Sequence, residues 1–513
     1  MRTVSFRVPL LMAGLVLASG LPSGGVRAQD QQLGTCRILP GTQRAVGRAV
    51  GQSRVTYVSR PRLACEGGVR INADSLVSFE ATGFNQLFGN VFFEDATRSL
   101  RATNARYFDR VGRLEADGAV RLTDKESGNV LTGENLLYLR AIPPGRPTEE
   151  LTLWGGRPHA LLHTGGGGTG DPAAPARTPY DVTADRIFLR GSSFFQAAGR
   201  VEVVRDSLNA FADTLRYEEL GERLLLSREA RVEQARYDLL GREILLHAPG
   251  DTLRRVEARG EGRLLGEDLE LEAPFIRMGF QDGTLERLWA TPLRPGQELE
   301  MTVGLRFLPQ ELDSVDLARP RARATDFEVN ADSIEVQAPG EVLERLFAVG
   351  SARAESSARD SLNTPDTPDL VRRDWIRGDT VVALFGEAPE RAAGDSVRHV
   401  LERLEARGAA ASLYRLEPDS AGADAPPDSL AAAGVVAPEA ERGEIEGGAA
   451  ETRIFRPRRE PAVHYVTAFE IIIVFDDGQV DRMEVRGLEQ GIHLDPSGRP
   501  RRAAPARRTG GGR

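Results

Sequence analysis

An octet that recurs along the chain constrains the fold more than any other feature of the sequence. It reads VGRLEADG at 111–118, and related octets start at positions 253, 343, 401 and 480. Another copy, at 285–292, ends in proline, and weaker copies start near positions 192 and 221. The starts at 192, 221, 253 and 285 lie 29, 32 and 32 residues apart, and those at 285, 343 and 401 lie 58 apart. A period of about 30 residues is typical of folds that stack one small unit many times.

A second motif alternates with the octet. It reads ADSL at 73–76 and returns at 184–187, 212–215 and 331–334, with looser versions at 133–136 and 378–381. Each copy opens a short run in which apolar and polar residues alternate. Two motifs interleaved at one spacing indicate that each repeat holds two or three short segments of the same kind.

The octets predict β-strands. Their fourth and sixth positions are apolar and their fifth and seventh are mostly charged, and Val120 and Leu122 continue this alternation past Gly118. A period of two is typical of a half-buried strand. The competing interpretation is a helix, which needs ten or more patterned residues, whereas these copies stop after seven at a glycine or proline. The glycine in mid-run predicts a bend or a bulge.

One repeat cannot bury its apolar face alone, but a stack of repeats can. We therefore expect an all-β fold, an elongated antiparallel stack of short strands. Several inward positions hold only alanine, such as Ala116, Ala258 and Ala348. Either two sheet faces pack tightly at these positions, as in a β-sandwich, or a groove stays open. An open apolar groove would bind acyl chains, because burying each CH₂ is worth about 0.8 kcal/mol.

The two motifs, together with the GNVFF run at 89–93, resemble the OstA-like, or LptA-type, family. This family includes the lipopolysaccharide transport proteins LptA and LptC and the N-terminal domain of LptD. The resemblance is strongest over 71–133 and extends over 56–495 with insertions. It implies an antiparallel β-jellyroll that is open along one side. It also implies a non-enzymatic periplasmic protein that shields the acyl chains of lipopolysaccharide in its interior and leaves the sugar portion outside.

Partners and site residues follow from this resemblance. The implied partners are lipopolysaccharide, other Lpt-type β-jellyroll proteins stacked through edge strands, and an outer-membrane barrel, with no cofactor. The expected lipid-binding groove consists of apolar residues from the alternating runs. These are Leu76, Val91, Phe93, Leu114, Val120, Leu122, Leu136, Tyr138, Ile187, Leu189, Val201, Val203, Leu215, Tyr217, Ile334 and Val336.

The chain has 513 residues, which is much longer than one LptA-type domain. We expect either two fused jellyrolls or one extended jellyroll. The predicted divisions are a signal peptide at 1–28, an N-terminal segment at 29–70, a first jellyroll at 71–255, a second jellyroll at 256–495 with disordered insertions at 355–370 and 417–452, and a disordered basic tail at 496–513.

The first residues predict export. Arg2 and Arg7 precede an apolar stretch at 9–20, and small residues at 26–28 resemble a cleavage site. We expect a periplasmic protein, and the resemblance adds an association with the outer membrane. Export places Cys36 and Cys65 in an oxidising compartment, where they either form a disulfide or remain two buried thiols.

Other functional classes find little support in the sequence. The net charge of −9 argues against a nucleic-acid partner. His159 and His163 have the i, i+4 spacing of a helical metal site, but they follow a strand-like run and have no glutamate between them. We expect no metal site and no catalytic site, because neither a GxSxG elbow nor an acid/base cluster such as a β-helical polysaccharide lyase needs is found. The alternative hypothesis is an exported β-solenoid that serves as a scaffold or adhesin, with a filled interior and no lipid.

Overall fold

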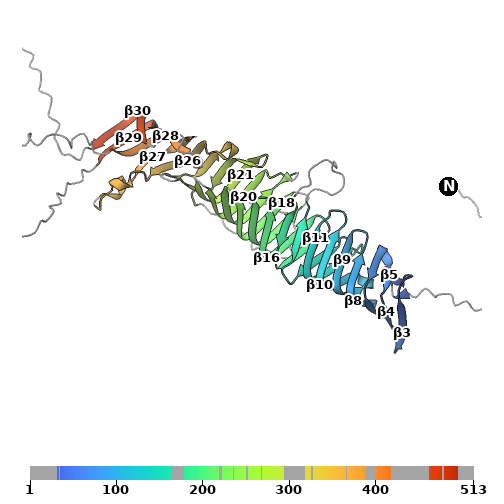
Figure 1. The fold of residues 1–513 in the computed structure, drawn as a ribbon. Helices are drawn as coiled ribbons and strands as arrows, with labels where there is room; N and C mark the ends of the chain where they lie inside the picture. The colour runs from blue at the N-terminus through green and yellow to red at the C-terminus, as the bar shows by residue number, and fades with distance from the viewer. Residues whose placement is uncertain are drawn as a thin grey trace, which may run out of the picture.

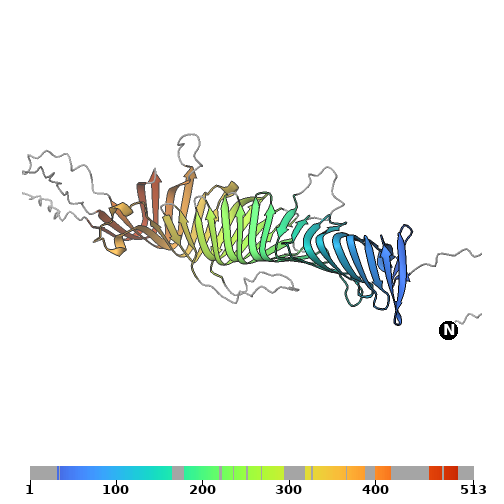
Figure 2. The same cartoon turned by 60° about the horizontal axis from the view of Figure 1, so that its bottom comes forward.

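The computed structural model shows an elongated, nearly all-β body in which successive strands follow one another from end to end (Figures 1 and 2). The described strands all join one antiparallel hydrogen-bonded sheet, with short 3-10 turns between some of them. This confirms the expected fold class. The structure describes residues 32–33, 35–163, 178–218, 222–234, 236–249, 252–266, 269–293, 318–324, 327–365, 367–387, 399–416, 461–476 and 479–494.

The strands fall into short ones of up to eight residues and long ones of ten or more. The short strands are β1 (Gln32–Leu33), β2 (Cys36–Ile38), β3 (Arg44–Val50), β4 (Ser53–Ser59), β5 (Arg62–Cys65), β6 (Val69–Asn72), β7 (Ser75–Phe79), β12 (Glu150–Trp154), β13 (His159–Leu162), β14 (Tyr180–Thr183), β15 (Arg186–Arg190), β22 (Thr284–Thr291), β23 (Arg321–Ala324), β24 (Phe327–Asn330) and β25 (Ser333–Gln337). The long strands are β8 (Phe84–Glu94), β9 (Arg98–Phe108), β10 (Arg113–Asp124), β11 (Val130–Leu139), β16 (Phe194–Arg205), β17 (Leu208–Glu218), β18 (Arg223–Gln234), β19 (Tyr237–His247), β20 (Arg255–Gly266), β21 (Glu270–Gln281), β26 (Arg345–Ser356), β27 (Asp374–Glu387), β28 (His399–Leu416), β29 (Ala462–Asp476) and β30 (Gln479–Leu494). The 3-10 turns are η1 (Glu66–Gly68), η2 (Asp109–Val111), η5 (Pro339–Glu341), η6 (Asp360–Leu362) and η7 (Asp369–Val371).

The sheet is folded lengthwise into two walls. The first wall contains β3, β4, β7, β12, β15, β22 and β25, and the second contains β1, β2, β5, β6, β13, β14, β23 and β24. Each long strand contributes one half to each wall. For example, β11 pairs with β12 through its C-terminal half and with β13 through its N-terminal half. The walls are therefore continuous along one edge, which we call the corner. At the opposite edge, which we call the mouth, no described strand of one wall pairs with a strand of the other.

The corner is formed by a β-bulge in the middle of the long strands. At six positions the register shifts across a glycine and the residue after it, and both residues have a positive φ; five of these glycines end an octet, and Gly89 opens the GNVFF run. The glycines have φ between 71° and 87°, a region that L-residues avoid. The predicted mid-strand bend is confirmed. The six pairs are Gly89–Asn90, Gly118–Ala119, Gly199–Arg200, Gly260–Glu261, Gly350–Ser351 and Gly408–Ala409.

The two interleaved sequence motifs meet at this corner. The backbone N–H of Asp332, from an Ala-Asp motif, donates to the carbonyl oxygen of Gly350, from an octet, over 3.0 Å. The Asp332 carboxylate also packs against Gly350. A Cβ atom added to Gly350 would lie 2.4 Å from Oδ2 of Asp332, which is too close. The same arrangement joins Asp74 to Gly89 and Asp185 to Gly199. The spacing of the motifs thus reflects a repeated contact between the Asp of one strand and the glycine of its neighbour.

We predict that Gly350→Ala lowers the free energy of unfolding by about 2 kcal/mol, because the methyl group meets a left-handed backbone and the Asp332 carboxylate. The reciprocal change is Arg228→Gly in β18, where an exposed arginine with φ 63° occupies the corner position. It should stabilise the protein by about 0.5–1 kcal/mol. Chemical denaturation of both variants tests this, and a stabilising Gly350→Ala would contradict the account of the corner.

The strand pairing continues without interruption across the predicted boundary at residues 255/256. This point lies in β20, which pairs with β19 on one side and β21 on the other. The division into two jellyrolls stays a prediction that the hydrogen bonding does not mark. The predicted signal peptide at 1–28, the insertion at 417–452 and the tail at 496–513 lie outside the described residues.

The insertion predicted at 355–370 is described by the structure at 355–365 and 367–370, and its disorder stays a prediction. These residues end β26 and contain η6 and the start of η7. Arg359 anchors this segment, because its Nη1 donates to the carbonyl oxygen of Arg415 in β28 over 2.7 Å and pairs with Asp374 in β27. These contacts join the polar segment to two strands that lie farther along the chain.

Candidate functional site

The interior is lined by continuous rows of cross-strand partners. In the first wall, an inner row passes from strand to strand without a polar residue. From Ala116 to Ala406, alanines in this row repeatedly lie beside larger aliphatic side chains on the neighbouring strands. The larger side chains therefore fill space that the octet alanines leave. The row runs through Val58, Leu76, Leu87, Ala105, Ala116, Leu136, Leu153, Ile187, Ala197, Leu215, Leu226, Ile244, Ala258, Ile276, Ala290, Ile334, Ala348, Val381, Ala406, Ile471 and Val485.

The second wall presents a matching row. It is apolar from Leu63 to Ile376 and becomes polar at Ser412 near the C-terminal end. The row runs through Leu63, Ile71, Phe93, Leu100, Leu122, Leu131, Ala160, Val182, Val203, Ala210, Val232, Leu239, Leu264, Leu271, Ala322, Val329, Ala354, Ile376 and Ser412. Because each strand faces its neighbour in register, one apolar surface extends along almost the whole described body.

The structure places all sixteen expected groove residues on these walls. Fifteen are buried and Tyr217 is half-buried. The first wall holds Leu76, Leu114, Leu136, Tyr138, Ile187, Leu189, Leu215, Tyr217, Ile334 and Val336, and the second holds Val91, Phe93, Val120, Leu122, Val201 and Val203. Sequence alternation thus selected residues that belong to one interior, and their role in binding lipid is taken up under the proposed function.

The interior is filled by its own side chains where the walls touch. Phe93 of the second wall contacts two rings of the first wall, Tyr107 and Tyr138, with ring centroids 5.6 and 6.3 Å apart. Farther along the body, Tyr237 approaches Phe280 across the walls at 6.5 Å. Of the two interpretations left open by the alanines, close packing describes these regions. A ligand can lie between the walls in these regions only if they separate.

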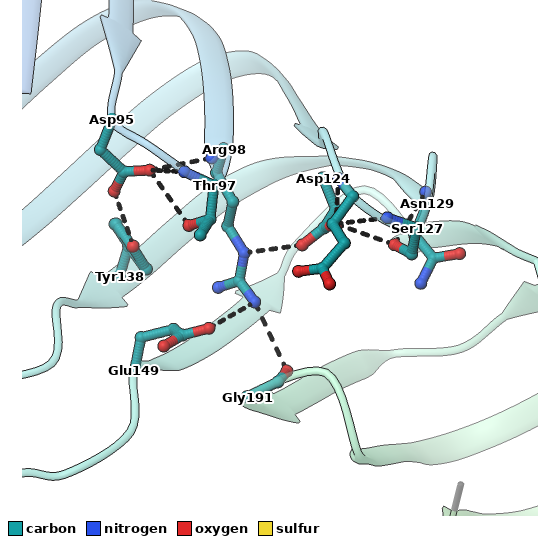
Figure 3. Close-up of polar contacts among 10 residues, drawn as sticks. Asp95, Thr97, Arg98, Asp124, Ser127, Asn129, Tyr138, Glu149 and Gly191 are labelled. Atoms are coloured by element: carbon teal, nitrogen blue, oxygen red, sulfur yellow. Dashed lines mark hydrogen bonds and ion pairs between the residues drawn. The ribbon is translucent and has the colours of Figure 1, made fainter. Parts of the chain in front are cut away.

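A buried clasp crosses the mouth in the N-terminal third (Figure 3). Arg98, at the mouth end of β9 in the second wall, has a side chain only 4% exposed. Its Nη2 lies 3.0 Å from Oε1 of Glu149 and 3.4 Å from the carbonyl oxygen of Gly191, both at the mouth edge of the first wall. Its Nε donates to Asp124 of its own wall over 3.3 Å. One guanidinium thus ties together strands that are far apart in sequence.

Tyr138 and Asp95 reinforce this clasp. The Tyr138 hydroxyl of the first wall donates to Oδ2 of Asp95 in the second wall over 2.9 Å. Burial, followed by the nearby Asp95 carboxylate, raises the pKa of Tyr138, so the hydroxyl stays protonated and remains a donor. Asp95 also accepts from the backbone N–H groups of Thr97 and Arg98, which orients its carboxylate toward the tyrosine.

Asp124 makes the clasp sensitive to acid. Burial raises the pKa of its carboxyl group, but hydrogen bonds from Ser127 and the charge of Arg98 lower it by more, so the pKa lies below its ordinary value. A carboxyl whose pKa is lowered on folding contributes stability above its unfolded pKa, near 4, and loses that contribution as the pH falls through the lowered value. The clasp is therefore intact at neutral pH.

Further contacts cross the mouth on both sides of the clasp. The backbone N–H of Thr35, beside β2 in the second wall, donates to Asp109 at the end of β9 in the first wall over 3.0 Å. The Arg140 side chain reaches the carbonyl oxygen of Gly67 over 3.2 Å. Toward the middle of the chain, Arg236 and Glu341 form an ion pair of 3.4 Å between the two edges.

A cavity of about 210 Å³ opens at the mouth in the middle of the body. The first wall contributes Tyr217, Leu224 and Leu246, which are successive cross-strand partners in β17, β18 and β19. The second wall contributes residues from the ends of β14, β16, β17 and β18. These are Tyr180, Arg205, Leu208 and Gln234. The cavity thus lies between the two edges, and leucines from both walls form part of its lining.

The two histidines with metal-site spacing have other surroundings. His159 lies in β13 and pairs with Asp181 of β14 at 2.5 Å, while the backbone N–H of His163 donates to Asn129 over 2.7 Å. A strand rises about 3.3 Å per residue, so positions four apart on it are about 13 Å apart, too far to share one ion. In the part of the chain that the structure describes, no three His, Cys, Asp or Glu side chains gather as a metal site.

The described segments also hold no helix with the length and apolar character that spanning a bilayer requires.

Fold and interior together define a class, that of elongated antiparallel β-proteins whose folded sheet encloses a continuous apolar lining. Neither a known family model nor a curated protein matches this chain. Among solved structures, a similar chain is LptH of Pseudomonas aeruginosa, described as the LptA homologous periplasmic component of the conserved lipopolysaccharide transport device. It is 18% identical over 32% of this chain and 82% of its own, with a TM-score of 0.16. This likeness is too slight to support a conclusion about function.

Sequence reasoning missed the clasp and the cavity. Arg98 lies in the turn region between two alternating runs, where neither motif recurs, and its partners Glu149 and Gly191 belong to other repeats. The sequence does hold a feature that could have pointed to the clasp. The DATR segment at 95–98 places two charged residues between two runs in which apolar residues alternate with polar ones. The contacts of these charges depend on the lengthwise fold of the sheet, which periodicity alone does not reveal.

Proposed function

We propose that this protein is a non-enzymatic periplasmic carrier that shields the acyl chains of lipopolysaccharide between its two walls during outer-membrane assembly. The observation that carries the proposal is the pair of continuous apolar rows that face each other along the body. A hydrocarbon chain between these rows contacts apolar side chains instead of water. This transfer is favourable by about 25 cal/mol for each Å² of apolar surface buried. The motif resemblance to the LptA-type family supports the same role.

The ends of the sheet support a place in a chain of similar proteins. Among the described strands, β3 pairs only with β4 and β30 pairs only with β29. An unpaired strand edge accepts another strand through its backbone groups. We infer that other Lpt-type β-jellyroll proteins, or the periplasmic part of an outer-membrane barrel protein, add to these edges and extend the apolar rows.

Photo-crosslinking provides the direct test of lipid binding. We predict that a photo-reactive amino acid at Leu122 or Val203, both at most 2% exposed, captures lipopolysaccharide in cells. The same probe at neighbouring Arg121 or Glu202, whose side chains point outward, should capture about ten-fold less, because an adjacent strand position faces the opposite side of the sheet. Equal capture at inward and outward positions would refute an apolar binding interior.

The packed aromatic contacts between the walls favour one rival, the exported β-solenoid scaffold without lipid cargo. The two functions differ in what purifies with the protein. In native mass spectrometry, a carrier should be detected with bound lipopolysaccharide, whereas a scaffold should be detected at the mass of the protein alone. Depleting the protein and following lipopolysaccharide arrival at the cell surface then tests transport itself.

A further inference from the structure

The mouth is not uniform along the body. In the N-terminal third, contacts from Asp95 and Arg98 to Tyr138 and Glu149 hold its edges together. Beyond the middle, the Arg236–Glu341 ion pair and the Tyr237–Phe280 contact again join the two walls. Between these two regions lies the 210 Å³ cavity, which is lined by side chains of both edges.

The walls of this cavity belong to the apolar lining. Leu224 is the cross-strand partner of Leu246, and both contact the core that contains the inner rows. Leu208 reaches the same core from the opposite wall. The rim, in contrast, carries the polar groups of Arg205, Glu222 and Gln234. An amphiphile fits this arrangement, because its hydrocarbon can enter over the leucines while its polar part stays at the rim.

The size of the cavity indicates an entrance rather than a complete binding pocket. It is smaller than the roughly 300–1,000 Å³ of pockets that enclose a whole small ligand. Only part of one acyl chain can occupy it before the walls move. Separating walls that are in contact exposes apolar surface, so the first insertion costs least where an empty volume already lies between them.

We propose that this cavity is a side entrance through which one acyl chain of an amphiphilic lipid passes between the medium and the apolar interior. The inference rests on the proposed lipid-carrier function and adds the point of entry. Lipid enters at the middle of the body, between β14 and β19, and spreads from there toward both ends. The clasped regions on either side keep the chain from leaving the interior laterally.

The order in which interior positions meet lipid tests this proposal. Purified lipopolysaccharide in detergent micelles is mixed with the full chain carrying a photo-reactive residue at Leu87, Leu215 or Ile471, and samples are flashed at increasing times. Leu215 lies on β17 beside the cavity, whereas Leu87 and Ile471 lie in the same row near the two ends. Capture should appear first at Leu215 and later at both ends.

Substitutions that fill the cavity with a larger side chain provide a second test of the side entrance. Leu224→Trp should slow capture at all three positions by about ten-fold or more, because insertion then requires roughly 1.4 kcal/mol of additional activation free energy. Leu208→Trp fills the cavity from the opposite wall and should act in the same way. Leu401→Trp, at another half-buried leucine that contacts the core outside the cavity, is the matched control. Circular dichroism verifies that each variant is folded.

The outcomes separate the entrance from the carrier function. First capture at Leu87 or Ile471 would overturn the side entrance while supporting lipid binding. Unchanged rates in both cavity-filling variants would overturn it as well. Absence of capture at every interior position would reject the carrier function, and the entrance with it.

Discussion

Replacing Arg98 by methionine should lower the stability of the N-terminal third by about 3–5 kcal/mol, the usual cost of removing one partner from a buried ion pair. The arginine side chain is 4% exposed, and those of Asp124 and Glu149 are 16% and 23% exposed. Without the guanidinium, two largely buried carboxylates face each other across the mouth. Hydrogen exchange of the β9–β12 backbone measures the loss, since these strands carry the clasp.

A neighbouring arginine supplies the control. Arg101 lies on the same strand but faces outward, over the ring of Phe92 at 5.6 Å. Arg101→Met should cost only about 0.5–1 kcal/mol, as expected for an exposed cation–π contact. Adding Glu149→Gln to Arg98→Met should recover part of the loss, because it removes one uncompensated charge. Equal effects of the two arginine variants would show that the clasp does not hold the walls together.

Reducing the Cys36–Cys65 disulfide should destabilise the N-terminal end by about 3–4 kcal/mol in the chain-entropy treatment. The bond joins cross-strand partners in β2 and β5, 29 residues apart, at the mouth edge of the second wall. Thr35, next to Cys36, makes the hydrogen bond to Asp109 across the mouth. Opening the disulfide frees β1 and β2 and therefore weakens this contact as well.

Thermal unfolding with and without reductant tests the disulfide, together with hydrogen exchange in β2 and β5. The variant in which both cysteines are replaced by alanine should resemble the reduced protein, and reductant should not change it further. Strands beyond the clasp should keep their protection, because repeats contact mainly their neighbours. Undiminished protection of β2 after reduction would mean that strand pairing alone holds this end.

The strand content was predictable because the physical cause is local. Alternation at Val120 and Leu122 is a property of a few consecutive residues, and it places both side chains in the interior. The corner was predictable for the same reason, since Gly118 and Gly350 mark positions where only glycine readily adopts a positive φ. The contacts of Arg359 were not predictable, because they join it to residues 15 and 56 positions away.

By itself, the sequence determined the strands, their period, the corner and the identity of the interior residues, because each of these follows from the alternation and backbone preferences of neighbouring residues. Only the tertiary structure decided how the two walls close on each other. The Arg98–Gly191 contact spans 93 residues and the Tyr138–Asp95 contact spans 43. Such contacts, like the cavity that Leu224 and Leu246 line, arise when the folded sheet brings its two mouth edges together, and no local pattern encodes that approach.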